Sequence, residues 1–159
     1  MNITIRRAIM EDLKEIQKLN YKLFELEYNQ FDSNLNTNWT FSKVGENYFK
    51  NTIENGIVLV AIADYKIIGY LAGSINIQSS YSINSLAELD NCYIEEQYRN
   101  QGIGKQLLEK FKEYCINQEI KEIKVTASAK NINARKFYEK NNFEDFEITY
   151  KMKIGGKKE

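Results

Sequence analysis

The sequence predicts a single-domain α/β protein whose mixed, mostly antiparallel sheet contains a central parallel pair of strands and is flanked by helices. Residues 57–63 and 67–77 are apolar runs separated by three residues, a connection short enough to require an antiparallel hairpin. Residues 86–94 predict a strand that is followed by an amphipathic helix and a further strand at 122–129. Such a crossover is right-handed and makes its two strands parallel and adjacent. The length of 159 residues suits one domain with a sizeable core.

The N-terminal part is expected to form a strand and two helices. Residues 3–8 predict the first strand. The helix after it carries an apolar stripe at helical spacing, which we expect to pack on the core. This stripe consists of Leu13, Ile16, Leu19, Leu23 and Phe24. Residues 29–41 predict a loop or an irregular helix, and residues 42–54 predict a second helix that Ser42 caps and Asn55-Gly56 ends.

The C-terminal part predicts two more helices and a last strand. The stripe of the helix after residue 94 consists of Ile103, Leu107, Leu108, Phe111 and Cys115. A short helix is expected over residues 133–141 and a terminal strand over residues 143–154. The predicted domain therefore covers residues 1–154, and residues 155–159 are expected to form a flexible tail.

Composition excludes several classes of function. Lysine plus arginine and aspartate plus glutamate each number 22, and no basic tract favours nonspecific binding to nucleic acid. The N-terminus is too charged for a signal peptide, and the longest apolar run, residues 57–63, is too short to span a membrane. Two cysteines without a local pairing motif favour a cytoplasmic protein. Because histidine is absent, no metal site is predicted, and any acid–base chemistry must use other groups.

The turn that precedes the helix at residue 103 has the features of an anion site. Gly102 and Gly104 would let a ligand approach the backbone, and the first N–H groups of a helix have no partners within it. Between residues 97 and 108 there are two cations, Arg99 and Lys105, and no carboxylate. The spacing matches neither the dinucleotide-binding fingerprint nor a P-loop.

Two motifs carry a family resemblance. Residues 98–104 (YRNQGIG) resemble the [QR]-x-x-G-x-[GA] acyl-CoA signature of the GNAT N-acetyltransferases. Residues 131–138 (NINARKFY), with Asn142-Phe143 after them, resemble the N-x-x-A-x-x-F-Y…G-F segment of that family. Asn142 stands where the family usually has glycine, and asparagine is the next best residue for the left-handed conformation that ends a helix. The resemblance is clear over residues 57–143.

The resemblance implies the acyl-CoA N-acyltransferase fold, with acetyl-CoA as the co-substrate. It implies that the pyrophosphate lies on a loop made of Arg99, Asn100, Gln101, Gly102, Ile103, Gly104 and Lys105. The pantetheine arm would lie between the two parallel strands, bonded to the backbone near Ile94 and touched by Asn131. In this fold the strands part beyond a bulge, and the N–H near Cys92 is our candidate donor to the oxyanion.

Tyr138 matches the family tyrosine that donates to the cofactor sulfur. A phenol stays protonated at neutral pH and can protonate a leaving thiolate; the alternative is a core tyrosine. Glu88 and Asp90 are candidate bases, expected to share a strand face with Cys92 and Ile94. The alternative for these acids is that they line an edge or pair with a basic residue. Both cysteines are expected to be buried apolar residues rather than nucleophiles.

The predicted reaction is transfer of acetyl from acetyl-CoA to a primary amine by direct attack in a ternary complex. One rival is a non-catalytic acyl-CoA-binding regulatory module on the same fold, which would have no need of Tyr138 or the acids. Another is an unrelated nucleotide-binding domain, which ATP or NAD would stabilise in place of CoA.

The acceptor is predicted to be a small molecule or a peptide with positive charge. The first helix and the following loop resemble the acceptor-binding region of the family and mix acids with aromatics, which suits a cationic amine. These residues are Glu25, Glu27, Tyr28, Phe31, Asp32 and Trp39. The alternative is a solvated helix end beside core aromatics. The terminal strand, if exposed, would be able to pair across a homodimer.

Overall fold

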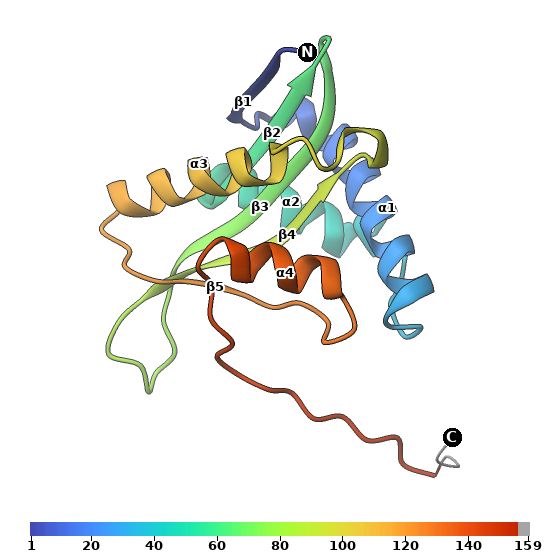
Figure 1. Cartoon of the computed structure of the whole chain (residues 1–159), viewed down its shortest axis with the longest axis vertical. Helices are drawn as coiled ribbons and strands as arrows, with labels where there is room; N and C mark the ends of the chain where they lie inside the picture. The colour runs from blue at the N-terminus through green and yellow to red at the C-terminus, as the bar shows by residue number, and fades with distance from the viewer. Residues whose placement is uncertain (156–159) are drawn as a thin grey trace.

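A five-stranded mixed sheet separates two layers of helices in the computed structural model, which describes residues 1–155 (Figure 1). The strands lie in sequence order and are β1 (Ile3–Arg7), β2 (Ile57–Ala63), β3 (Lys66–Ile77), β4 (Leu86–Ile94) and β5 (Ile123–Val125). The helices are α1 (Leu13–Gln30), α2 (Lys43–Asn55), α3 (Ile103–Asn117) and α4 (Ile132–Lys140). Only the β4–β5 pair is parallel, as the crossover through α3 predicts.

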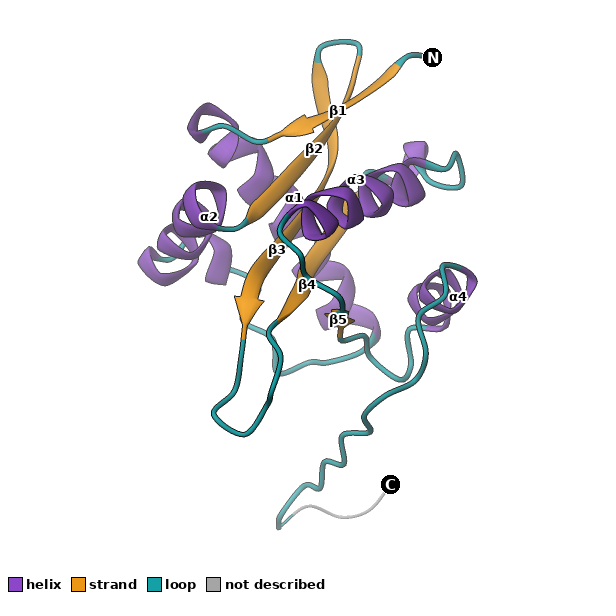
Figure 2. Ribbon diagram, turned by 90° about the vertical axis from the view of Figure 1, so that its left-hand side faces the viewer, coloured by secondary structure: helices purple, strands orange, loops and turns teal. Residues whose placement is uncertain are grey.

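Each face of the sheet has its own hydrophobic core. On one face the stripe of α3, from Ile103 to Cys115, packs on β2, β3 and β4, and α4 joins it through Phe137 and Tyr138. On the other face α1 and α2 pack on the alternate residues of β2 and β3, with Phe49 and Tyr70 fully buried between them. Figure 2, turned by 90°, shows the helices on both sides of the sheet. The chain thereby buries both faces of the β2–β3 hairpin.

The local predictions for the hairpin and for the second helix are confirmed. Asp64 and Tyr65 form the hairpin turn with φ values of 47° and 64°. Ser42 caps α2, because its Oγ accepts a hydrogen bond from the Gly45 N–H at 3.2 Å. Asn142 follows α4 with a φ of 68°, the left-handed conformation expected of it. Of the described helices, none combines the length and the apolar character that crossing a bilayer requires.

Strand β4 contains a bulge at Asp90. In the antiparallel pairing with β3, Leu89 lies opposite Gly73 and Asn91 lies opposite Ala72, so Asp90 has no partner. One extra residue of this kind bends its strand and increases the local twist. The bend falls where β4 stops pairing with β5, since the parallel ladder covers only residues 87–89 and 123–125.

The bulge also reverses the alternation of side chains along β4. Leu89 before the bulge and Cys92 after it pack on the same core. The expectation that Glu88 and Asp90 share a strand face with Cys92 and Ile94 is therefore wrong, because it assumed an unbroken period of two. Cys92 and Ile94 face the α3 and α4 side.

Two strand predictions fail in the C-terminal part. Strand β5 has three residues rather than the eight of the predicted range 122–129, because β4 bends away after its bulge. Residues 143–154 form no strand at all, although their apolar and polar residues alternate. Alternation shows that a segment can be a strand, but only a pairing partner makes it one. We call residues 144–154 the C-terminal arm. The predicted tail, apart from Gly155, lies outside the described residues.

Candidate functional site

Beyond its bulge, β4 presents backbone groups to a side on which no strand pairs with it. The parallel pairing with β5 ends at Leu89. Further along, the Glu95 N–H donates to the Ile68 carbonyl of the β3 side at 2.9 Å. Because successive N–H groups of a strand point in alternate directions, those of Cys92 and Ile94 point away from β3, toward the side that β5 has left. This arrangement supports the two donors predicted there.

The loop before α3 offers a row of backbone donors. Within residues 1–155, nothing accepts a hydrogen bond from the N–H groups of Gln101, Gly102, Ile103, Gly104 and Lys105. The first hydrogen bond of the helix runs from the Gln106 N–H to the Gly102 carbonyl at 3.1 Å. Asn100 and Gly102 take φ values of 60° and 79°, which turn the chain sharply into the helix. Free donors at a helix N-terminus form a site for an anion such as a pyrophosphate.

The two glycines of this loop have different roles. A Cβ built on Gly102 meets nothing within 4 Å, so a ligand can reach the backbone there. A Cβ on Gly104 would lie 3.4 Å from the Phe137 ring and 3.5 Å from Ile94 Cδ1. A Cβ at Gly104 would therefore make ordinary contacts with α4 and Ile94, so Gly102 is the more open of the two glycines, and contact between Gly104 and a ligand stays a prediction.

Arg99 fixes this loop to β4. Its Nε donates to the Ile94 carbonyl at 2.8 Å, and its guanidinium lies 5.0 Å from the centroid of the Tyr93 ring. The backbone N–H of Arg99 donates to the Glu96 carbonyl at 3.2 Å, so it is not free for a ligand. Only the terminal amino groups of the guanidinium could contact a phosphate. Lys105, by contrast, is exposed at the first turn of α3.

Helix α4 presents two of the predicted site residues. Asn131 caps the helix, because its Oδ1 accepts from the Ala134 N–H at 3.1 Å, and its amide NH₂ is the part that could contact a pantetheine arm. Tyr138 lies about two turns further along the helix, with its ring edge-on to Phe137 at 5.4 Å and to Phe143 at 5.3 Å. These contacts fix the orientation of the ring before any ligand binds.

Burial keeps the Tyr138 hydroxyl and the two cysteine thiols protonated. Burial, and then interaction with Cys92 and Glu27, raises the pKa of Tyr138 above its usual value. Burial also raises the pKa of Cys92 to about 12 and that of Cys115 to about 11. Tyr138 therefore keeps its proton at neutral pH. The cysteines are thiols rather than thiolates, which supports their assignment as apolar residues.

A network of polar side chains holds the bulge residue Asp90. Its Oδ2 accepts hydrogen bonds from the Tyr48 hydroxyl at 2.7 Å and from Ser74 Oγ at 2.9 Å. Asn91 Nδ2 donates to the Tyr48 oxygen at 3.1 Å. Burial and the charge of Asp90 raise the pKa of Tyr48, so its proton stays in place. These two donors hold one carboxylate oxygen in place and leave Oδ1 for another ligand. Glu88, two residues earlier, is half-exposed.

Sequence reasoning missed Tyr48. It lies on α2, for which sequence analysis predicted a helix and no site residue, and its ring packs against Trp39 and Phe49. Its hydroxyl, however, reaches β4, 42 positions further along the chain. No local motif marks such a pair, since tertiary packing alone brings the two elements together.

The predicted acceptor region divides into two parts. Glu27 is partly buried, and burial, with the nearby charge of Asp32, raises its pKa. It is close enough to Tyr138 and Tyr70 for its charge to act on both. Glu25 instead lies on the exposed side of α1, where its carboxylate raises the pKa of the neighbouring Tyr21.

Of the aromatic residues of that region, Trp39 belongs to the core. Trp39 stacks on Phe24 at 5.6 Å between ring centroids, with an interplanar angle of 17°, and packs in the core of the α1 and α2 side. Trp39 is therefore a core aromatic, which was the alternative to a role in acceptor binding. Phe31 is half-buried and Tyr28 is 43% exposed.

Comparison with known proteins agrees with this geometry. Residues 13–143 match the Acetyltransferase (GNAT) family. The chain is 26% identical over 136 residues to an uncharacterized N-acetyltransferase of Archaeoglobus fulgidus, covering 84% of this chain and 88% of that protein. PaiA N-acetyltransferase of Thermoplasma acidophilum, solved in complex with coenzyme A, has a TM-score of 0.77 at 25% identity and 91% coverage of both chains. The aminoglycoside N-acetyltransferase AAC(6')-Iy, in complex with CoA, has a TM-score of 0.75 at 17% identity, covering 98% of this chain and 96% of that chain. The family match extends over most of the chain, so the protein belongs to the GNAT acetyltransferases.

Proposed function

We propose that this protein transfers acetyl from acetyl-CoA to a primary amine by direct attack in a ternary complex. The observation that carries the proposal is the opening of β4 from β5 at the Asp90 bulge. It frees the N–H groups of Cys92 and Ile94 beside the donor loop at the start of α3. If acetyl-CoA bound with its pyrophosphate on that loop, its thioester carbonyl would lie beside these two N–H groups.

Each step of the transfer has a candidate residue. The Cys92 N–H stabilises negative charge that develops on the carbonyl oxygen, and Ile94 N–H positions the arm of the co-substrate. Tyr138, held protonated by burial, donates a hydrogen bond or its proton to the leaving sulfur. Asp90, with Oδ1 available, receives the ammonium of the acceptor and accepts its proton directly or through water. Glu88 is the alternative base.

The choice of base can be tested by pH dependence. Replacement of the true base by its amide, Asp90→Asn or Glu88→Gln, should lower activity more at neutral than at high pH, because the free amine is abundant at high pH. If neither variant shows this pattern, the protein supplies no base and the acceptor loses its proton to solvent.

The acceptor is proposed to be a cationic amine such as a polyamine, an aminoglycoside or a basic peptide. Glu27 supports this, because it is a partly buried carboxylate of α1 that is close enough to Tyr138 and Tyr70 for its charge to act on both. A structural neighbour is an aminoglycoside acetyltransferase, although at 17% identity it supports the fold rather than the substrate. Glu27→Gln should raise KM for a cationic acceptor about tenfold, an effect of roughly 1.4 kcal/mol. Glu25→Gln is the matched control, since that acid lies on the exposed side of the same helix.

Release of free thiol from acetyl-CoA in the presence of a panel of amines tests the whole proposal. Cationic amines should react fastest, and added salt should slow them. Thermal shift measurements with CoA, ATP and NAD separate the rivals. CoA stabilisation without turnover of any amine would favour the non-catalytic acyl-CoA-binding module, whereas stabilisation by ATP or NAD alone would favour a nucleotide-binding domain.

A further inference from the structure

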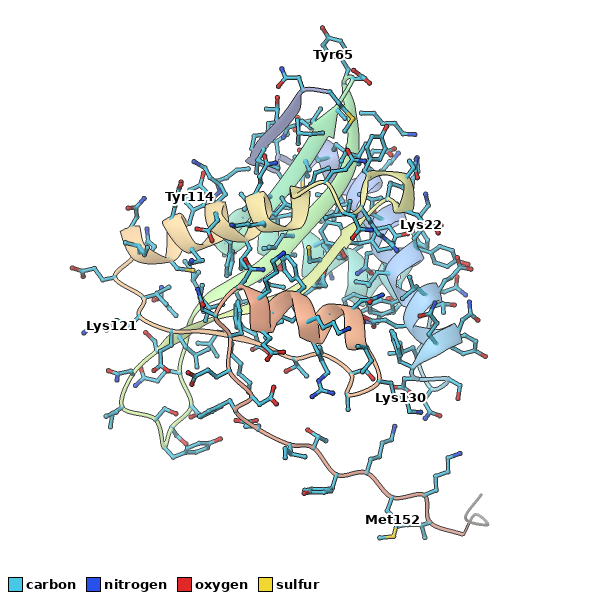
Figure 3. The ribbon with its side chains drawn as sticks, viewed as in Figure 1. Lys22, Tyr65, Tyr114, Lys121, Lys130 and Met152 are labelled. Carbon is cyan, nitrogen blue, oxygen red and sulfur yellow. The ribbon has the colours of Figure 1, made fainter. Side chains whose placement is uncertain are left out.

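An ion pair joins α1 to the segment that leads from β4 into the donor loop. Lys22 Nζ lies 2.6 Å from Glu95 Oε1, although the two residues are 73 positions apart in the chain. Glu95 directly follows β4, and Lys22 reaches it from α1 (Figure 3). The Glu95 side chain is only 15% exposed. A carboxylate in such a place needs a partner, because an unpaired charge away from water is costly.

The backbone of Glu95 is fixed at the base of the donor loop. Its N–H donates to the Ile68 carbonyl of β3 at 2.9 Å, and its carbonyl accepts from the Tyr98 N–H at 2.9 Å. These two hydrogen bonds hold the main chain on both sides of the residue. Rotation of the Glu95 side chain therefore decides which cation the carboxylate meets.

Arg99 is the second cation in this neighbourhood. Its guanidinium lies 5.0 Å from the centroid of the Tyr93 ring. Burial raises the pKa of Tyr93, and the charges of Arg99 and Lys22 oppose that rise. The charge of Glu95 adds to the rise, so this carboxylate and the guanidinium act on the same hydroxyl. Both cations are thus candidates for one carboxylate.

The Arg99 guanidinium nevertheless has no carboxylate partner. Within residues 1–155 it forms no ion pair, and its one hydrogen bond runs from Nε to the Ile94 carbonyl at 2.8 Å. The two terminal amino groups remain for a ligand. A carboxylate and a phosphate bind these same groups, because each accepts two parallel hydrogen bonds from the planar fork of an arginine. Glu95 and a pyrophosphate would therefore compete for Arg99.

We propose that Lys22 is a positioning residue for the co-substrate, because it holds the Glu95 carboxylate away from Arg99 and leaves that guanidinium free for the pyrophosphate of CoA. The inference rests on the proposed placement of the pyrophosphate on the donor loop. Without Lys22, the competing carboxylate would be tethered beside Arg99, which gives it the advantage of a high effective concentration. Helix α1, otherwise assigned to the core and to the acceptor, thereby takes part in binding the co-substrate.

Isothermal calorimetry with CoA tests the competition. Lys22→Met leaves Glu95 without its partner, so the Kd for CoA should rise about tenfold, as expected for one lost charged contact. Lys22→Gln, a polar neutral replacement, should behave in the same way. Lys22→Arg keeps the ion pair and should keep the affinity.

Removal of the carboxylate should rescue the loss. Glu95→Gln alone has no competitor for Arg99, so its Kd for CoA should lie within about twofold of the wild-type value. Lys22→Met combined with Glu95→Gln should return to that value, although it lacks the ion pair altogether. Thermal unfolding without ligand separates the two effects, because both variants that carry Lys22→Met lose the tie between α1 and the sheet, but only one loses CoA affinity.

Lys66→Met is the matched control. Lys66 lines the same groove as Lys22 and Glu95, and it forms no ion pair in the described part of the chain. Its replacement removes the same charge without freeing a carboxylate, so the Kd for CoA should not change. A rise as large as that of Lys22→Met would overturn the proposal, since the general charge of the groove would then attract CoA.

Two other results would also overturn it. Wild-type affinity in folded Lys22→Met would show that Lys22 has no part in CoA binding. A double variant as weak as Lys22→Met would show that the ion pair only holds α1 in place. A crystal structure of Lys22→Met should show the Glu95 carboxylate within about 4 Å of the Arg99 guanidinium. These failures would leave the proposed function intact, whereas a wild-type protein that bound no CoA would remove both.

Discussion

Tyr138→Phe is the most informative single substitution in the proposed mechanism. It removes one hydroxyl and keeps the ring, whose edge-on contacts with Phe137 and Phe143 at 5.4 and 5.3 Å do not involve the oxygen. The fold and the packing of α4 should therefore be retained. Because burial raises the pKa of the phenol, the wild-type side chain is protonated throughout the range in which the enzyme can be assayed. The variant thus tests proton donation with little else changed.

The expected loss is that of a positioned general acid. Such groups contribute about 10²- to 10⁴-fold to a rate, so kcat should fall by that factor, which corresponds to roughly 2.7–5.5 kcal/mol of activation free energy. Affinity for CoA, measured by calorimetry, should change little. The rate of the wild type should show no loss from ionisation of Tyr138 below about pH 10, because the raised pKa lies above the usual value for tyrosine.

A matched control distinguishes chemistry from packing. Tyr114 lies on α3, is partly buried against the same core and takes no part in the proposed site (Figure 3), so Tyr114→Phe should leave turnover unchanged. Near-normal turnover in Tyr138→Phe, with acetyl transfer shown to limit the rate, would remove this tyrosine from the mechanism. Equal losses in both variants would mean that the core, rather than the hydroxyl, is responsible.

Three further results are expected. Gly102→Ala should weaken CoA binding, because it introduces a Cβ at a φ of 79° on the open side of the donor loop, and isothermal calorimetry of this variant beside Gly104→Ala, whose Cβ would make ordinary contacts, measures the difference. Tyr48→Phe should raise KM for the acceptor more than it lowers the affinity for CoA in steady-state assays, since it removes one donor from Asp90. Acid should destabilise the fold through Asp12. Burial alone would raise the pKa of this carboxyl, but hydrogen bonds from the Arg6 guanidinium and the backbone lower it below its usual value. The stabilisation that Asp12 contributes is therefore present above about pH 3.9 and is lost as the pH falls through the folded-state pKa. Urea unfolding of Asp12→Asn and the wild type should show a difference in stability that shrinks over that acid range.

Much of the fold follows from periods and turn residues, because those are local. The stripe from Ile103 to Cys115 predicts the buried face of α3, and the cap at Ser42 predicts where α2 begins. The acyl-CoA signature at residues 98–104 predicts the donor loop, since a glycine with positive φ at a helix start is a backbone property. The C-terminal arm marks the limit of such reasoning. Its alternation is as clear as that of β1, but no strand of the same copy pairs with it.

The polar part of the site depends on contacts that no local pattern contains. The hydrogen bond from Tyr48 to Asp90 joins elements 42 positions apart, and its formation depends on how α2 packs on the sheet. Likewise, Glu25 and Glu27 are the same residue type two positions apart, but of the two only Glu27 is partly buried and acts with its charge on Tyr138. Helical rotation separates the two acids by about 200°, but which direction faces the site is decided by the core.

The bulge at Asp90 links the fold to the site, and its role can be isolated from that of the carboxylate. Deletion of Asp90 would make Leu89–Gly73 and Asn91–Ala72 consecutive regular pairs, so β4 would straighten. The strand would then run on beside β5, and the backbone donors after the bulge would gain protein partners in place of the ligand. Asp90→Gly is the matched control, since it also lacks the carboxylate but keeps the extra residue. We expect the deletion to lose most CoA affinity in calorimetry while Asp90→Gly retains it. Hydrogen exchange should show new amide protection after position 89 in the deletion alone. Equal CoA affinity in the two variants, with both folded, would mean that the opening between the strands does not depend on the bulge.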